Sequence, residues 1–307
     1  MDSSAWPEGN VGHVALVGRP NTGKSTFLNT VLQTHLAPVS AKPQTTRRRL
    51  LGVWSGEGGQ ILFLDTPGVF QGASELDRAM GGAVQAALAD ADAVLCLVDP
   101  LRPPGAEDAQ VAAAIHGLAK PVLVGLNKAD LASPGQLERA AAWWRERLPA
   151  APQFRFAATR RETLDAVLAA LAERLPRGPF LFDPEDLTDQ VARVLGAELI
   201  RETVLEALDE EVPHAVAVEI DQWREEGART RIRATLHVER EAHKPILIGA
   251  AGRMIRQLTR QSEPKLAELC GGPVKLQLFV KVTEKWRQRR DFLERLGLHA
   301  GRRPPRE

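Results

Sequence analysis

The sequence lacks the features that would place it in a membrane, in a secreted fold or around a structural metal. No apolar stretch among its 307 residues approaches the roughly 20 residues that a membrane-spanning helix needs. Residues 1–9 lack the basic-then-apolar pattern of a signal peptide. The two cysteines, Cys96 and Cys270, lie far apart and neither belongs to a CxxC pair. These absences predict a reduced, cytoplasmic protein without structural metal, and no pattern indicates an obligate protein partner.

Charge is balanced over the whole chain, with a formal net value of +1, but it is unevenly distributed. Residues 181–226 hold 3 basic and 14 acidic residues, a net of −11, and residues 227–307 hold 19 basic and 8 acidic residues, a net of +11. Such a split favours a C-terminal surface that faces a polyanion. Alternatively, the two blocks fold together and neutralise each other, and both interpretations stay open.

Apolar runs alternate with alanine-rich helical stretches in the first part of the chain, which predicts an α/β domain with a mostly parallel sheet. The expected strands are residues 14–17, 61–64, 93–98, 122–126 and 154–157. The expected helices are residues 27–32, 79–91, 107–119 and 136–148. A glycine-rich turn between residues 47–54 and the strand at 61 predicts an antiparallel hairpin at one edge. Proline and glycine within residues 175–179 mark a boundary, so we expect domains at 1–180 and 181–307.

Past this boundary the pattern changes to that of an α+β domain. Thr188 is the expected N-cap of a helix that runs to Leu208. Further helices are expected at residues 245–248 and 253–269, and strands at residues 215–220, 231–238 and 274–282. In the last of these, apolar and polar residues alternate strictly, so its apolar face would pack on the helices. Residues 301–307 are expected to be disordered.

Residues 18–26 fit the phosphate-binding pattern GxxxxGK[ST], and they lie between a predicted strand and a predicted helix, as the pattern requires. Glycines let backbone N–H groups turn toward a triphosphate, and the helix N-terminus adds partial positive charge. The catalytic Lys24 would reach the β- and γ-phosphates, and Ser25 would ligate Mg²⁺. The predicted binding residues are Gly18, Arg19, Pro20, Asn21, Thr22, Gly23, Lys24, Ser25 and Thr26.

Two further motifs each follow directly on a predicted strand. In Asp65-Thr66-Pro67-Gly68, the Asp65 carboxylate would hold Mg²⁺ and the Gly68 amide would contact the γ-phosphate. In Asn127-Lys128-Ala129-Asp130, the Asp130 carboxylate would accept hydrogen bonds from guanine N1–H and the exocyclic amine. Adenine offers neither donor there, so it would leave a carboxylate unpaired.

Alone, the first of these motifs is compatible with an ordinary turn and the second with a solvated helix start. In order, at strand ends where open α/β sheets bind ligands, they predict a GTPase that uses GTP, GDP and Mg²⁺. The three motifs resemble the translation-factor-like class of GTPases.

That resemblance places a switch threonine within residues 42–47, and of Thr45 and Thr46 it favours Thr46 as the Mg²⁺ ligand. The class usually shows Ser-Ala at its last guanine element. This chain has Ala157-Ala158 there. The backbone amide of Ala158 could still donate to guanine O6, but the serine hydroxyl that braces the loop is absent.

The residue after the second motif is Val69, where many signalling GTPases carry a glutamine that orients water. We therefore expect slow hydrolysis driven by Mg²⁺, Lys24 and backbone donors. Asn21 matches the asparagine of potassium-activated GTPases, which predicts that it helps to bind K⁺.

Residues 243–255 contain a GxxG loop between two predicted helices, which resembles a KH domain of type II. Its glycines would let the backbone approach RNA phosphates. Two alanines stand where KH loops commonly carry a basic or polar residue, so phosphate attraction must come from neighbouring side chains. The predicted RNA-binding residues are Lys244, Ile248, Gly249, Ala250, Ala251, Gly252, Arg253 and Arg256.

The order of the two domains, with Thr-Thr-Arg in the switch, resembles the Era family of bacterial ribosome-assembly GTPases. Residues 184–186, 197–202, 215–219 and 279–282, with Trp286, resemble the C-terminal segments of that family. The resemblance implies binding near the 3′ end of 16S ribosomal RNA during maturation of the 30S subunit. It also implies peripheral contact with the inner face of the cell membrane.

Three alternatives stay open. The chain fits a GTPase of large-subunit assembly or tRNA modification, or a constitutive RNA-binding module whose nucleotide site is only structural. An ATPase is disfavoured by Asn127 and Asp130.

Overall fold

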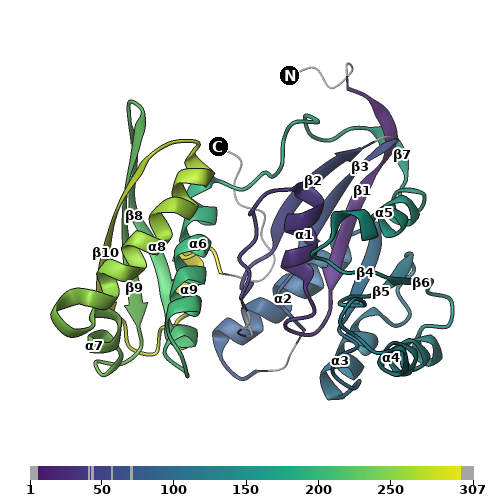
Figure 1. The fold of residues 1–307 in the computed structure, drawn as a ribbon, viewed down its shortest axis with the longest axis horizontal. Helices are drawn as coiled ribbons and strands as arrows, with labels where there is room; N and C mark the ends of the chain where they lie inside the picture. Colours follow the sequence, from purple (N-terminus) through teal and green to yellow (C-terminus); the bar gives the residue numbers. More distant parts are fainter. Residues whose placement is uncertain (1–5, 41, 43–44, 57, 70–71, 299–307) are drawn as a thin grey trace.

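The structure, a computed structural model, describes residues 6–298 apart from 41, 43–44, 57 and 70–71. The expected tail at 301–307 lies outside the described residues. Two halves lie side by side, each built on its own sheet (Figure 1). Within the described residues, no helix has the length and apolar character needed to cross a membrane.

The larger half is an open α/β sheet with strand order β2-β3-β1-β4-β5-β6. Its strands are β1 (Glu8–Val17), β2 (Leu50–Gly56), β3 (Gly59–Asp65), β4 (Ala93–Val98), β5 (Val122–Leu126) and β6 (Gln153–Arg155). Among these six strands all neighbours pair in parallel except β2, which forms the expected antiparallel hairpin with β3 at one edge. The mostly parallel sheet predicted from the alternating pattern is therefore confirmed.

Helices cover both faces of this sheet. They are α1 (Lys24–Leu32), α2 (Glu75–Asp90), α3 (Ala106–Ile115), α4 (Pro134–Arg147) and α5 (Asp165–Ala172). Buried side chains of α2, α3 and α4 form one core cluster with the sheet, and those of α1 and α5 form another on the opposite face. Burial of apolar strands on both sides explains why they read as continuous apolar runs.

The linker between the halves is more ordered than its proline and glycine content predicts. Residues Arg177–Pro179 form β7, which pairs antiparallel with the start of β1. The Gln60 side chain then fixes the linker, because its Nε2 donates to Phe182 O at 2.9 Å and its Oε1 accepts from Leu181 N at 2.8 Å. The linker therefore follows the sheet instead of leaving it at once.

The smaller half has the order expected of a type II KH domain. Its elements are α6 (Ala192–Ala207), β8 (Ala217–Glu226), β9 (Arg229–Val238), α7 (His243–Ile248), α8 (Arg253–Cys270), β10 (Val274–Val282) and α9 (Arg290–Arg295). Strand β9 pairs antiparallel with β8 and parallel with β10. Leu276 and Leu278 of β10 are buried in the core shared with α6 and α8, which confirms the predicted apolar face. Short 3-10 turns occur at Arg161–Thr163, Pro213–Ala215, Ala250–Gly252 and Trp286–Gln288.

One predicted helix start is wrong. Helix α6 begins at Ala192, and its N-cap is Val191, three residues later than the predicted N-cap, with no side-chain cap. The Thr188 hydroxyl donates instead to Leu51 O at 2.5 Å, which ties the linker to β2. A long-range backbone acceptor has replaced the local cap that a threonine before a helix usually provides.

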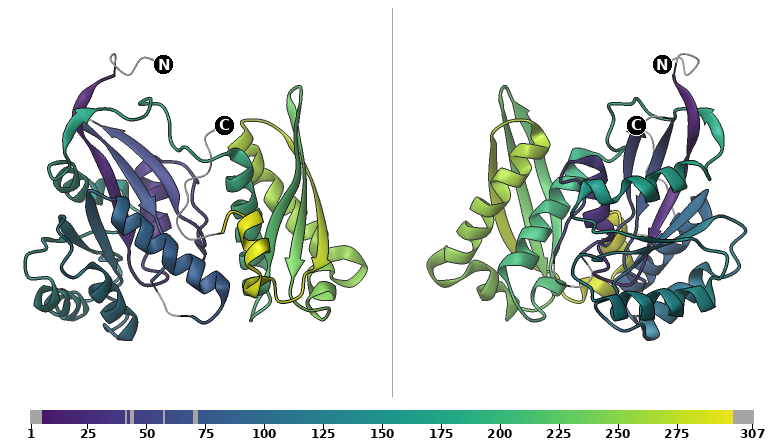
Figure 2. Two further views of the ribbon diagram at one scale, coloured as in Figure 1. Left: turned by 180° about the vertical axis from the view of Figure 1, so that it is seen from behind. Right: turned by 45° about the vertical axis from the view of Figure 1, so that its right-hand side comes forward.

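The two halves also share an apolar contact. Leu76 and Met80 of α2 pack with Trp286, Phe292 and Leu293 of the C-terminal segment. Figure 2 shows α9 beside the end of α2 in the view from behind. This contact is formed by the helix that follows the Asp65–Gly68 motif, so the nucleotide half and the KH half meet next to a predicted nucleotide contact.

Candidate functional site

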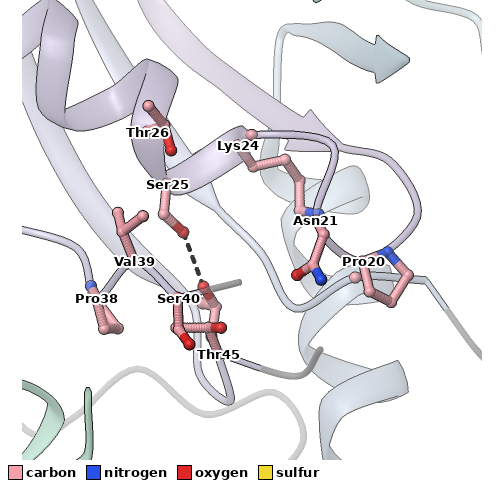
Figure 3. Close-up of a pocket in the computed structure, with 12 residues that line it drawn as sticks. Pro20, Asn21, Lys24, Ser25, Thr26, Pro38, Val39, Ser40 and Thr45 are labelled. Atoms are coloured by element: carbon pink, nitrogen blue, oxygen red, sulfur yellow. Dashed lines mark hydrogen bonds between the residues drawn. The ribbon is translucent and has the colours of Figure 1, made fainter. Parts of the chain in front are cut away.

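The phosphate loop joins β1 to α1 and lines a pocket (Figure 3). Asn21 and Gly23 have φ angles of 64° and 94°, so the loop turns through the left-handed region twice. A Cβ at Gly23 would lie 2.3 Å from Asn127 Nδ2, which is why glycine is needed there. The pocket is lined by Pro20, Asn21, Gly23, Lys24, Ser25, Thr26, Pro38, Val39, Ser40, Thr45, Thr46 and Gly68.

The three predicted metal ligands come together in this pocket. Ser25 Oγ donates to Asp65 Oδ2 at 2.8 Å, and the hydroxyls of Ser25 and Thr46 are hydrogen-bonded at 2.9 Å. Thr46 Oγ1 also lies 3.4 Å from Asp65 Oδ2. The other carboxylate oxygen, Asp65 Oδ1, is buried and has no hydrogen-bond partner among the described residues. Two hydroxyls and a carboxylate with an unused oxygen fit Mg²⁺, which prefers hard oxygen ligands.

Burial shifts the two charged groups of the pocket toward their neutral forms. It raises the pKa of Asp65 to about 6, against the opposing charge of Lys24. It lowers the pKa of Lys24 to about 8, against the opposing charge of Asp65. Both groups stay mostly charged at neutral pH, and a cation beside Asp65 or a triphosphate beside Lys24 would move each pKa back toward its ordinary value. The pocket is therefore built for a charged ligand.

Lys24 is held over the loop that it belongs to. Its Nζ donates to Gly18 O at 3.3 Å and to Arg19 O at 3.1 Å. The amide of Val69 donates to Gly18 O at 3.1 Å, which brings the second motif against the first. A Cβ at Gly68 would lie 2.7 Å from Pro20 N, so only glycine permits this approach.

The remaining residues of the second motif are structural in this arrangement. Thr66 Oγ1 donates to Leu16 O at 2.7 Å, which fixes the end of β3 to β1. Pro67 is buried beside it.

At the base end, Asn127 connects three loops. Its Nδ2 donates to Thr22 O at 2.8 Å, and its Oδ1 accepts from Lys128 N and Ala158 N, each at 2.7 Å. The predicted contact of the Ala158 amide with guanine O6 would compete with this hydrogen bond, and it stays a prediction. Asp130 lies 3.8 Å from Arg160 NH2 in an ion pair.

Sequence reasoning missed two aspartates, Asp99 and Asp108, that anchor the phosphate loop from outside. Arg19 is buried, and it donates to Asp108 Oδ2 at 2.6 Å and to Asp99 O at 2.8 Å. Lys128 Nζ donates to Asp99 Oδ2 at 2.7 Å and to Asn21 O at 3.1 Å. The position of Asp99 directly after β4 was the available signal, because strand ends of parallel sheets meet at the ligand edge.

The predicted RNA-binding loop joins α7 to α8. Gly249, Ala251 and Gly252 have positive φ angles of 71°, 50° and 74°, and Ala251 and Gly252 lie in the left-handed helical region. Ala250 and Ala251 are exposed, as are the side chains of Arg253 and Arg256. Within the described part of the chain, Lys244, Arg253 and Arg256 form no ion pair with an acidic side chain. These cations are therefore available to an external anion.

Elsewhere the acidic and basic blocks do meet. Lys265 Nζ lies 2.9 Å from both Glu202 Oε2 and Glu206 Oε2, which joins α8 to α6. Arg295 lies 3.0 Å from Glu219. These ion pairs support mutual neutralisation for part of the two blocks, and a surface that faces a polyanion stays a prediction.

Each half matches a family model. Residues 13–128 match a model described as a 50S ribosome-binding GTPase, and residues 211–287 match the KH domain. Together with the pocket, these matches define a P-loop GTPase joined to a KH domain.

Full-length relatives narrow the class. The chain is 37% identical to GTPase Era of Lacticaseibacillus paracasei, over 94% of this chain and 97% of the relative. It is 37% identical to GTPase Era of Geobacter metallireducens, over 93% and 97%. The chain therefore belongs to the Era family of GTPases.

Solved structures agree over the whole length. An Aquifex aeolicus Era variant bound to GDP and AlF4⁻ has a TM-score of 0.89 and 33% identity, covering 94% of this chain and 99% of that one. Era in complex with MgGDPNP and nucleotides 1506–1542 of 16S ribosomal RNA has a TM-score of 0.90 and 33% identity, covering 95% and 99%.

Proposed function

We propose that this protein is a GTP-hydrolysing switch that binds the 3′ region of 16S ribosomal RNA and assists assembly and maturation of the 30S subunit. The observation that carries the proposal is the likeness, over 95% of the chain, to Era solved with MgGDPNP and a 16S RNA fragment. The exposed GxxG loop with its unpaired cations supports it. RNA binding would favour one nucleotide state, and that state would favour RNA binding in return.

The residues of the site have separate roles in GTP binding and hydrolysis. Ser25, Thr46 and Asp65 would hold Mg²⁺, and the bound ion would supply positive charge to the phosphates. Lys24 and the Gly68 amide stabilise the charge that develops during phosphoryl transfer. Asn127 fixes the base-binding loop, and Asp130 accepts from guanine. We place the domain boundary at 180/181, within the linker that follows β7.

Potassium dependence is the first test of the pocket. Asn21 lines the same pocket as Lys24 and Ser25, and no arginine is among the described residues that line it, so a cation held by Asn21 would supply the charge that an arginine finger gives elsewhere. We expect GTP turnover to be about tenfold faster in KCl than in NaCl at equal ionic strength. The Asn21→Ala variant should lose that difference. Equal rates for the unchanged protein in the two salts would contradict the role of Asn21.

RNA identity is the test of the function itself. We expect crosslinking in cells to recover the 3′ end of 16S RNA, with a yield that changes when a non-hydrolysable GTP analogue is added. Replacing Ala250 and Ala251 by aspartate places two negative charges at the loop and should weaken RNA binding by about tenfold or more. A matched control replaces the exposed Ala109 and Ala113 of α3 by aspartate, with the same change in net charge.

Three outcomes would contradict this proposal. Recovery of 23S RNA or tRNA would favour the alternative functions, the first of which also fits the 50S description of the matched family model. A yield independent of the nucleotide would favour a constitutive RNA-binding module. Equal loss in the α3 control would show that net charge, not the loop, carries binding.

A cytoplasmic location with peripheral contact at the inner face of the cell membrane stays a prediction from the family resemblance. The net charge of +11 in residues 227–307 motivates it. Failure to cosediment with anionic vesicles at low salt would contradict the membrane contact.

A further inference from the structure

The segment that carries Thr46 is held in place by a helix of the KH half. On α6, Arg201 NH2 donates to the backbone carbonyl of Thr45. Glu202 Oε1 accepts from Val39 N at 2.6 Å, and Val39 lies six residues before Thr45 in the same segment. These hydrogen bonds join residues more than 150 positions apart in the sequence. The switch segment and the RNA-binding half are therefore in direct polar contact.

Arg201 is itself fixed by a buried carboxylate. Its side chain is 3% exposed, and its Nε donates to Glu198 Oε2 at 2.9 Å. The other oxygen of Glu198 accepts from Arg48 Nε at 3.1 Å, two residues after Thr46. One carboxylate of α6 thus orients two arginines that flank the switch threonine in space. Buried guanidinium groups with defined partners have little freedom to move, so the position of the Thr45 carbonyl is well determined.

The Thr45 carbonyl and the Thr46 side chain are linked by a single planar peptide. Any displacement of that carbonyl turns the peptide and moves the Thr46 hydroxyl relative to Ser25 and Asp65. In the structure the Arg201 contact and the 2.9 Å contact between Thr46 and Ser25 exist together. We propose that Arg201 is a positioning residue for GTP hydrolysis, holding Thr46 at the metal site from within the KH half.

A neighbouring residue of the switch segment also contacts the KH half. Arg47 donates to Val216 O and to His214 O, each at 2.7 Å, so the switch segment is bound to the KH half on both sides of Thr46. A rotation of the KH half would therefore withdraw the Thr45 contact and the Arg47 contacts together. The inference deepens the proposed function and rests on it only for the link to RNA, because the effect on hydrolysis needs no RNA.

The test uses the full-length protein without RNA. Arg201→Met removes the donor while keeping an unbranched apolar chain, and we expect single-turnover kcat to fall about tenfold because Thr46 is misplaced. KM and GDP affinity should stay within about twofold, because Thr46 acts on Mg²⁺ and the γ-phosphate. Arg201→Lys, which keeps a cation but has a single donor nitrogen, should recover about half of the loss on a logarithmic scale. Arg193→Met on the same helix, where Arg193 is exposed and donates to Ile220 O, is the matched control and should leave kcat unchanged.

A double-mutant cycle separates positioning from simple stability. In a Thr46→Ala background, Arg201→Met should change kcat by less than about twofold, because the group it positions is gone. An undiminished tenfold loss in that background would overturn the proposal. So would an unchanged kcat for Arg201→Met, or for Arg201→Lys and Glu198→Gln if the methionine variant does not fold. Absence of 16S RNA from the crosslinks would overturn the proposed function while leaving these rates to decide the role of Arg201.

Discussion

Replacing Lys24 by alanine is expected to lower kcat for GTP hydrolysis by about 10²–10³-fold. Lys24 Nζ already lies at the mouth of the phosphate loop, where it donates to Gly18 O and Arg19 O. Burial lowers its pKa to about 8, which leaves it mostly charged at neutral pH, and a neighbouring triphosphate would raise that pKa again. Because Val69 stands where a water-orienting glutamine is common, we expect charge stabilisation to carry most of the rate and Lys24 to supply a large part of it.

Single-turnover hydrolysis and nucleotide affinity, measured together, check this prediction. Lys275→Ala, at an exposed lysine on β10 far along the chain from the pocket, is the control for loss of one positive charge. A Lys24→Ala variant that hydrolyses GTP within tenfold of the unchanged protein would contradict the assigned role. If the variant is inactive but still supports 30S assembly in cells, the nucleotide site is only structural and the constitutive module is favoured.

Replacing Asp130 by asparagine is expected to change the base that the protein selects. In the proposed site the carboxylate would accept from guanine N1–H and from the exocyclic amine, whereas asparagine offers only one acceptor. GTP affinity should fall by about 10²-fold or more, because a buried amine is left facing a donor. Xanthine carries a carbonyl in place of that amine, so asparagine can both accept from N1–H and donate to the carbonyl. XTP affinity should rise correspondingly.

Competition binding with GTP, XTP and ATP measures this change directly. Arg160→Ala is the matched control, because Arg160 lies 3.8 Å from Asp130 and its own side chain is 58% exposed. An exposed ion pair of this kind contributes little free energy, so the GTP affinity of Arg160→Ala should stay within about threefold of that of the unchanged protein. An Asp130→Asn variant that keeps its preference for GTP over XTP would show that another group reads the base. Strong competition by ATP in the unchanged protein would revive the ATPase alternative.

Several elements could be predicted from the sequence because their causes are local. Strand β10 has the predicted bounds, since strict alternation at Val274–Val282 leaves one face for the core. Strands β4 and β5 also have the predicted bounds, because both are apolar runs buried by helices on two sides. Element ends that depend on distant partners were missed. Strand β1 begins six residues before the predicted run, at Glu8, because β7 and β3 extend its pairing.

The sequence alone determined that this chain binds a guanine nucleotide and belongs with KH-containing GTPases. The nucleotide motifs are only a few residues long, and each follows the end of a strand. Their order along the chain is therefore enough to predict the site, which includes the loop glycines, Lys24, Ser25, Asp65 and Asp130. Only the tertiary structure decided that Ser25, Thr46 and Asp65 share hydrogen bonds and that Arg201 holds the Thr45 carbonyl. A buried arginine takes whichever carbonyl the packing brings to it, and no local pattern specifies a partner 156 positions away.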